Sequence, residues 1–371
     1  MWLKNIQILN FRNFSRLNLE FSPSINIFVG GNSQGKTNLI EAIYCLGRGI
    51  SFRTFEDDRL IKWEKDSFYL GGEGERKGNF LKYELSLAKN SRKLRRVNSH
   101  KVPIKNINYW LWMVAFSIQD VKIVQGGPFY RRNFLDEITS FLYPNFSYIK
   151  FSFSKVLNQR NVLLRKLREK REYPAHQMLG WNSQFLQLGS EIVYLRLKVL
   201  RKLASCLSNI YPRLRGSTCS IRLVYNSSFL DEEDNDLSIR KIKEKFYQKI
   251  KLVKDKEVEN GMSLIGPHRD DFQIIVNKIN QRVFGSQGDQ RTTAIALKLA
   301  EVELLREREG DIPIILLDDV PSDLDFKRIK LLLDLVKGKG QVFIATQNTG
   351  EFSKDFLEKS RIFHIREGEV D

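Results

Sequence analysis

Residues 30–37 read Gly30-Gly31-Asn32-Ser33-Gln34-Gly35-Lys36-Thr37. This spacing is that of the phosphate-binding loop G-x-x-x-x-G-K-S/T, in which glycines allow backbone N–H groups to surround phosphate oxygens. An apolar run, Ile25–Val29, precedes the loop, and an amphipathic segment, Thr37–Leu46, follows it. The pattern predicts a strand, a glycine-rich turn and a helix whose positive end faces the phosphates. It therefore predicts an ATP site.

The chemistry of such a loop assigns a role to each of its parts. Lys36 is expected to reach the β- and γ-phosphate oxygens, and the Thr37 hydroxyl is expected to ligate Mg²⁺. ATP and Mg²⁺ are therefore the predicted cofactors. The other predicted nucleotide-binding residues in this region are Gly30, Gly31, Asn32, Ser33, Gln34, Gly35 and Asn38.

A second apolar segment, Ile314–Leu317, ends in two carboxylates, Asp318 and Asp319. Asp318 is placed to hold Mg²⁺ through its water shell, as the acidic residue after a buried strand does in P-loop ATPases. Asp319 is expected to polarise the attacking water as a general base. Together with Lys36, Asp319 is a predicted catalytic residue.

Gln119 is the third candidate catalytic residue. It follows a predicted strand, Trp112–Phe116, at the junction with a helical region. In that place its amide can sense Mg²⁺ or the attacking water. A surface glutamine without a role explains the same position, and the sequence leaves both interpretations open.

A second anion-binding pattern lies far along the chain. Ser286, Gln287 and Gly288 precede a predicted helix over Gln290–Arg306, and exposed N–H groups at a helix start favour anions. Because the chain already has one phosphate-binding loop, we expect these residues to bind the γ-phosphate of ATP held by a second copy. Pro321–Asp325 is placed to cross such an interface. The alternative is a helix with an ordinary N-cap.

The charge of the chain favours a polyanionic partner. It carries 61 Lys and Arg against 44 Asp and Glu, a formal net charge of +17. Lys or Arg side chains that meet phosphates release condensed counterions, which favours nucleic acid. No helix-turn-helix or zinc-finger spacing is present, so recognition of backbone and junction shape is expected. The candidate contacts, which ordinary solvated faces also explain, are Arg92–Arg96, Arg160–Arg171 and Lys241–Lys251.

The order of predicted elements indicates an α/β fold in two lobes. Strands and helices alternate over residues 1–115 and 255–371, which we assign to an ABC-type P-loop ATPase head. Long amphipathic helices dominate residues 116–254, which form an inserted, mainly helical lobe. No run approaches the ~18 uncharged apolar residues of a membrane span, and the three cysteines have no metal-ligand spacing. We expect a cytoplasmic protein without a membrane partner.

Several blocks along the whole chain resemble the RecF family of SMC- and Rad50-like ABC ATPases. They occur in the order found in that family: residues 3–14, the loop 30–37, Ser51-Phe52-Arg53-Thr54, 124–136, 265–271 and 286–291. The Arg-Arg-x-Phe-Leu-Asp block within 124–136 and the block Gly266-Pro267-His268-Arg269-Asp270-Asp271 separate the family from other SMC and Rad50 relatives.

The resemblance implies an ATP-dependent homodimer that binds gapped, single-stranded and double-stranded DNA. Such a protein acts with RecO and RecR to load RecA in recombinational repair, and in replication-fork maintenance and SOS induction. Asp289 departs from the family, which usually has Gln there, and it adds negative charge beside the second phosphate site. Two rival functions are a non-hydrolysing SMC-like platform and an ABC transporter subunit. The transporter is disfavoured because its Leu-Ser-Gly-Gly-Gln signature and switch His are absent.

Overall fold

The chain forms two compact units, each described here by itself. The first contains Met1–Asp120 and Ile295–Asp371, and the second contains Val121–Ala294. The predicted interface loop 321–325 lies outside the described residues. This computed structural model describes residues 1–54, 56–103, 111–169, 175–231, 238–319, 340–350 and 352–371.

An antiparallel sheet forms one layer of the first unit. Alternating burial along its strands gives it one face toward the core, as in β2, where Ile6 and Ile8 are buried. The strands in spatial order are β3 (Phe14–Glu20), β2 (Asn5–Phe11), β5 (Ser67–Arg76), β6 (Asn79–Ala88), β7 (Leu94–Val97) and β8 (His100–Lys101), with β1 (Trp2–Leu3) pairing β5.

A mainly parallel sheet forms the second layer. β13 and β14 are buried along their whole length, which explains their continuous apolar sequences. The carboxyl ends of the parallel strands lie at one edge, where Asp318 pairs with both Ala345 and Ser117. In spatial order the strands are β16 (Glu369–Val370), β15 (Ser360–Arg366), β4 (Ile25–Val29), β14 (Val342–Thr346), β13 (Ile314–Asp318) and β9 (Met113–Ser117).

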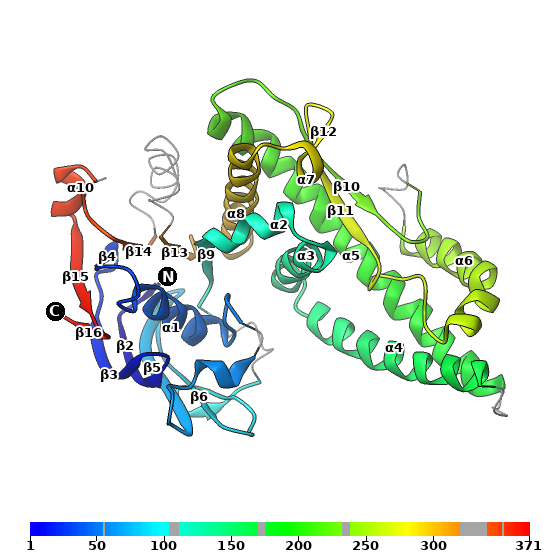
Figure 1. Ribbon diagram of the computed structural model, residues 1–371, viewed down its shortest axis with the longest axis horizontal. Coiled ribbons are helices and arrows are strands. Elements are labelled where there is room, and N and C mark those ends of the chain that lie inside the picture. The colour runs from blue at the N-terminus through cyan, green and yellow to red at the C-terminus, as the bar shows by residue number, and fades with distance from the viewer. Residues whose placement is uncertain (55, 104–110, 170–174, 232–237, 320–339, 351) are drawn as a thin grey trace. The chain divides into compact units, whose positions relative to one another are not determined.

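Helix α1 (Lys36–Arg48) lies between these sheets (Figure 1). It contacts β9, β13 and β14 of the parallel sheet and β2, β5 and β6 of the antiparallel sheet. Eleven of its 13 residues are buried, Leu39, Ile40 and Ile43 among them. The helix that the phosphate-binding loop enters is therefore also part of the hydrophobic core, which fixes the position of the loop.

The second unit is built on long helices, as predicted. α3 (Pro128–Leu142), α4 (Phe146–Arg168), α5 (Ala175–Arg215) and α6 (Ile239–Asn260) are preceded by the short α2 (Val121–Gln125). A small antiparallel sheet orders β10 (Ile221–Asn226), β11 (Asp271–Val276) and β12 (Ile279–Asn280). α5 contains Pro212 in its last turn and still continues to Arg215, because a proline that close to the helix end disturbs few hydrogen bonds.

The second unit also includes residues after α6. The sequence placed the return to the ATPase lobe at about residue 255. In the structure residues up to Ala294 pack with the second unit, because β11 pairs with β10 over six residues. The short α7 (Gln281–Phe284) then leads to α8 (Gln287–Glu309), which runs continuously from the second unit into the first. Among the described helices, none combines the length and apolarity that crossing a bilayer demands.

Candidate nucleotide-binding site

The loop from β4 to α1 has the conformation that its glycines permit. Gly35 has φ +118°, a region that L side chains rarely adopt, and a Cβ there would lie 2.6 Å from the Asn13 side chain. A Cβ on Gly30 would lie 2.3 Å from the Ile365 carbonyl oxygen on β15. Gly31 has no such contact, since its nearest neighbour is Gln34 Cγ at 3.8 Å. The loop thus passes so close to β15 that position 30 admits only glycine.

Lys36 lies across this loop. Its Nζ donates hydrogen bonds of 2.7 Å to the carbonyl oxygens of both Gly30 and Gly31, and the side chain is almost fully buried. Burial lowers the pKa of Lys36, while the charges of Asp319 and Asp318 oppose that shift. The ammonium group is therefore held within the loop that phosphates would occupy, close to both acidic residues.

Thr37 and Asp318 meet at the carboxyl edge of the parallel sheet. Thr37 Oγ1 donates a 2.7 Å hydrogen bond to Asp318 Oδ1. Burial raises the pKa of Asp318, and the Thr37 hydrogen bond and the charge of Arg53 only partly offset this. A buried, incompletely neutralised carboxylate beside a hydroxyl is a pair of hard oxygen ligands, which suits Mg²⁺ bound jointly with phosphate oxygens. The residues present fit the Mg²⁺–ATP that the loop implies.

The other two predicted catalytic residues lie at the same edge of the sheet. Asp319 follows Asp318 with φ +55°, is partly buried, and its N–H donates to the Ala345 carbonyl oxygen at 3.2 Å. Gln119 is exposed in a short 3-10 helix, Ile118–Asp120, two positions after the Ser117 that pairs with Asp318. The parallel sheet thus brings both to the edge where the loop lies, and their catalytic roles stay predictions.

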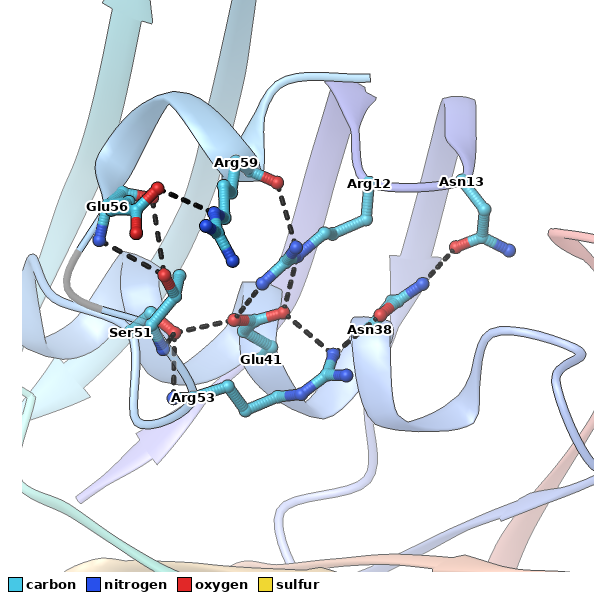
Figure 2. A network of polar contacts seen from close by, with 9 residues as sticks. Arg12, Asn13, Asn38, Glu41, Ser51, Arg53, Glu56 and Arg59 are labelled. Atoms are coloured by element: carbon cyan, nitrogen blue, oxygen red, sulfur yellow. Dashed lines mark hydrogen bonds and ion pairs between the residues drawn. The ribbon is translucent and has the colours of Figure 1, made fainter. Parts of the chain in front are cut away.

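A polar network joins the first turns of α1 to the turn after β2 and to the segment 51–59 (Figure 2). At its centre is Glu41, which is fully buried. Arg12 donates two hydrogen bonds of 2.8 Å to its two carboxylate oxygens, and Ser51 Oγ donates a third at 2.5 Å. This network buries a charge that the apolar face of α1 would otherwise exclude.

The same network extends to the phosphate-binding loop. Arg53 Nη1 donates to Glu41 Oε2 at 3.2 Å and to Asn38 Oδ1 at 2.9 Å. Asn38 Nδ2 in turn donates to Asn13 Oδ1 at 2.8 Å, and Asn13 Nδ2 donates to the Gln34 carbonyl oxygen at 3.3 Å. The side chain of Asn38, predicted to bind nucleotide, therefore braces the loop.

Sequence reasoning gave no role to Arg12, Asn13, Glu41, Ser51 or Arg53. One signal was available: Glu41 lies four residues after Thr37, on the buried face of a predicted amphipathic helix, where a carboxylate needs a cationic partner. The identity of that partner depends on tertiary contacts, which local sequence does not encode.

The second phosphate-binding pattern lies in the second unit. α8 begins at Gln287, and Ser286 caps it by accepting the Asp289 N–H at 3.1 Å. Ser286 Oγ also donates to Asp289 Oδ2 at 2.9 Å. A Cβ on Gly288 would have no heavy atom within 4 Å. Ser286, Gln287 and Gly288 thus form an open helix start that Asp289 partly neutralises.

Two arginines within the predicted DNA-contact segments are buried and bind other parts of the protein. Arg95 is buried, donates to the Gly47 carbonyl oxygen at 3.0 Å, and burial lowers its pKa to about 10. Arg160 is buried against Glu257 at 2.6 Å and Ser263 at 2.6 Å. Both were predicted as candidate DNA contacts from charge runs, and their burial excludes them. A run of charges does not show which of its positions face the core: Arg95 is buried in the first run, and Arg160 is buried with Leu163 and Leu164 in the second.

The chain is similar to known proteins over its full length. A family model described as RecF/RecN/SMC N terminal domain matches residues 2–370. "DNA replication and repair protein RecF" of Bacillus thuringiensis strain Al Hakam is 36% identical over 371 residues, 100% of this chain and 98% of the relative. The protein of the same name from Bacillus cereus strain B4264 is similar to the same extent.

Solved structures agree. One described as the recombination mediator protein RecF with ATP, in the RecFOR pathway, has a TM-score of 0.91 and 31% identity, covering 100% of this chain and 97% of that one. An SMC head bound to the C-winged helix domain of ScpA has a TM-score of 0.55 at 14% identity, with 100% and 96% covered. The second shares only the fold. The predicted α/β ABC-type ATPase head is thereby confirmed.

Proposed function

This chain belongs to the RecF family, and from that premise we propose that it is an ATP-driven DNA-binding protein of recombinational repair and replication. One observation carries the nucleotide part. The hydrogen bond of 2.7 Å from Thr37 to Asp318 joins the phosphate-binding loop to the acidic strand end, with the buried Lys36 beside them. These are the groups that position ATP phosphates and Mg²⁺ in P-loop ATPases.

Each of these side chains has a distinct task in the proposed site. Lys36 would exchange its bonds to the loop carbonyls for phosphate oxygens, and Thr37 and Asp318 would hold Mg²⁺, which neutralises developing phosphate charge when bound. Asp319 would accept a proton from the attacking water, and Gln119 would orient that water. Ser286, Gln287 and Gly288 of a second copy would bind the γ-phosphate from the opposite side, so that ATP links two subunits.

Similarity to the relatives supports the proposed biological role. The structural relative is described as a recombination mediator with ATP in the RecFOR pathway. We propose that this chain likewise acts in the cytoplasm with RecO and RecR to load RecA at gapped DNA, and contributes to fork maintenance and SOS induction. It would bind single- and double-stranded DNA while the ATP-bound homodimer is closed, and hydrolysis would release it.

Helix α6 offers a surface for the DNA part of this proposal. Its 22 residues include eight Lys or Arg against four Asp or Glu. Lys243, Tyr247, Lys251 and Lys254 are exposed and spaced by four, four and three positions, which places them on one side of the helix. Lys251 Nζ lies 4.3 Å from the centroid of the Tyr247 ring. A row of ammonium groups with an aromatic ring suits a sugar-phosphate backbone with an unstacked base.

Binding of gapped and blunt duplex DNA, with and without ATP over a salt series, tests this role. ATP should strengthen binding, and more for gapped DNA. If all three lysines of the α6 row contact phosphates, replacing them by Gln should reduce the slope of log K against log salt by about 2.7. A control removes three lysines that already pair with carboxylates, and its slope should stay unchanged: Lys4, Lys89 and Lys359. Equal binding with and without ATP would contradict the proposal.

The non-hydrolysing platform is the second candidate, and the contact of Asp289 with Ser286 favours it. Phosphate release with and without gapped DNA discriminates the two functions. The ATPase predicts slow release that gapped DNA accelerates and that Asp319→Asn abolishes. The platform predicts no release under either condition, while ATP still changes DNA binding.

A further inference from the structure

The hydroxyl of Ser286 is already engaged within its own helix start. It accepts the Asp289 N–H at 3.1 Å and donates its proton to Asp289 Oδ2 at 2.9 Å. A hydroxyl has a single hydrogen to donate. A phosphate oxygen that is to receive the Ser286 hydrogen bond must therefore displace the carboxylate of Asp289.

The carboxylate of Asp289 also interacts favourably with the positive end of the α8 dipole. It lies in the first turn of α8, where the unsatisfied N–H groups and the helix dipole favour a negative charge. A bound phosphate would be stabilised by the same helix end. The Asp289 carboxylate therefore occupies, as part of the chain, the position where the phosphate anion is expected.

The second oxygen of the carboxylate faces a cation from another helix. Arg215, the last residue of α5, has its Nη2 at 3.6 Å from Asp289 Oδ1. One turn away on each helix, Thr293 Oγ1 donates to the Asp289 carbonyl oxygen at 2.7 Å and lies 3.4 Å from the buried Tyr211 hydroxyl. The two contacts between the helices align the start of α8 with the end of α5, so Asp289 lies between Ser286 and Arg215, with one oxygen toward each.

We propose that Asp289 is an internal competitor of the incoming γ-phosphate at Ser286, and that Arg215 is the counterion that draws its carboxylate away. In the free protein the carboxylate is shared between the two. For a phosphate to bind, the carboxylate moves fully to Arg215, and the Ser286 hydroxyl donates its hydrogen bond to a phosphate oxygen in place of Asp289 Oδ2. The pair thus sets how much ATP is needed to close the dimer. The inference rests on the proposed function of Ser286.

The size of the effect follows from charge. A carboxylate and a phosphate within ~5 Å at a partly exposed site repel each other enough to weaken the contact about tenfold. A two-fold symmetric dimer closes two such sites, so the dimer association constant should change by about the square, roughly a hundredfold. Because the Arg215 pair is partly exposed, its removal should have a smaller effect, about threefold per site.

Sedimentation equilibrium with Mg²⁺–ATP measures that constant. Asp289→Asn keeps an oxygen that can accept from Ser286 but removes the charge, and it should strengthen dimerisation about a hundredfold. Arg215→Gln should weaken dimerisation about tenfold in the wild-type background and less than about twofold in the Asp289→Asn background. Arg213→Gln is the matched control, because it removes an exposed charge from the same turn of α5. It should change the constant less than about twofold.

The outcomes separate this inference from its premise. Ser286→Arg reports on the premise, because it blocks the helix start whatever Asp289 does. If Ser286→Arg abolishes ATP-dependent dimerisation but Asp289→Asn leaves it equal to wild type or weaker, Asp289 is only a helix cap and the inference is wrong. Equal effects of Arg215→Gln in both backgrounds would also overturn it. If Ser286→Arg dimerises like the wild type, the premise fails and the inference with it.

Discussion

The Thr37 hydroxyl donates a hydrogen bond of 2.7 Å to Asp318, which lies 281 positions later in the sequence. The parallel pairing of β13 with β14, and of β14 with β4, produces this contact, because it brings the ends of β4 and β13 to one edge. Two distant parts of the chain are thereby combined into one candidate Mg²⁺–ATP site.

Asp318→Asn should stabilise the nucleotide-free protein and abolish its response to Mg²⁺–ATP. Burial raises the pKa of Asp318, so the ionised carboxylate destabilises the folded state. This cost is absent below the unfolded pKa, about 3.9, and is complete once pH exceeds the folded pKa. The variant should therefore melt above the wild type at pH 8, and the difference should shrink as pH falls toward 4.

Addition of nucleotide should reverse that order. At an ATP concentration about a hundred times the Kd, wild type should gain about 2.7 kcal/mol in free energy of unfolding, while Asp318→Asn gains little. Thermal melts of both proteins with Mg²⁺–ATP, and with ATP plus a chelator, provide the measurement. An equal gain in the two proteins would show that Asp318 is not a metal ligand.

Glu41→Gln should destabilise the first unit by about 2–3 kcal/mol, because it removes the charged hydrogen bonds of the buried carboxylate to the partly exposed Arg12 and Arg53. Glu56→Gln is the control within the same view (Figure 2). Glu56 is exposed and pairs with Arg59 at 2.6 Å, and its loss should cost less than about 0.5 kcal/mol. Urea unfolding measures the loss of stability in both variants. Similar losses would show that the buried network around Glu41 does not stabilise the first unit.

Gly30→Ala and Gly31→Ala should differ although they are neighbours in one loop. The added methyl of the first would lie 2.3 Å from the Ile365 carbonyl oxygen, a backbone atom that cannot easily move, whereas the second meets only ordinary contacts. We expect Gly30→Ala to weaken ATP binding by more than about tenfold and Gly31→Ala by less than about threefold. Fluorescent ATP titration decides this, and equal losses would contradict the loop geometry.

The sequence predicted what local spacing encodes. The phosphate-binding loop, the strand before it and the Asp318–Asp319 pair are short patterns whose chemistry depends on neighbours in the chain. The network around Glu41 depends instead on three segments that meet only in the folded protein, so no single segment of the sequence predicts it. The contact of Asp289 with Ser286 is a local i, i+3 pair and was within reach of sequence reasoning. The Arg215 contact required the packing of α5 on α8.

The burial of Arg95 and Arg160 shows a further limit. Both belong to basic runs, and a charge run does not indicate which of its members turns inward. Each is retained in the core because it finds specific acceptors, the Gly47 carbonyl for Arg95 and the Glu257 carboxylate for Arg160. Buried arginines with such acceptors are structural, and the net charge of the chain overstates the basic surface accordingly.

Subunit mixing tests the central claim, a composite ATP site made by two copies, most directly. Lys36→Met removes the phosphate-binding lysine, and Ser286→Arg blocks the second anion site. Sedimentation with Mg²⁺–ATP should find each variant monomeric alone, whereas an equimolar mixture should form a heterodimer with one intact composite site. A mixture that stays as monomeric as its components, or Ser286→Arg that dimerises alone like the wild type, would contradict the account.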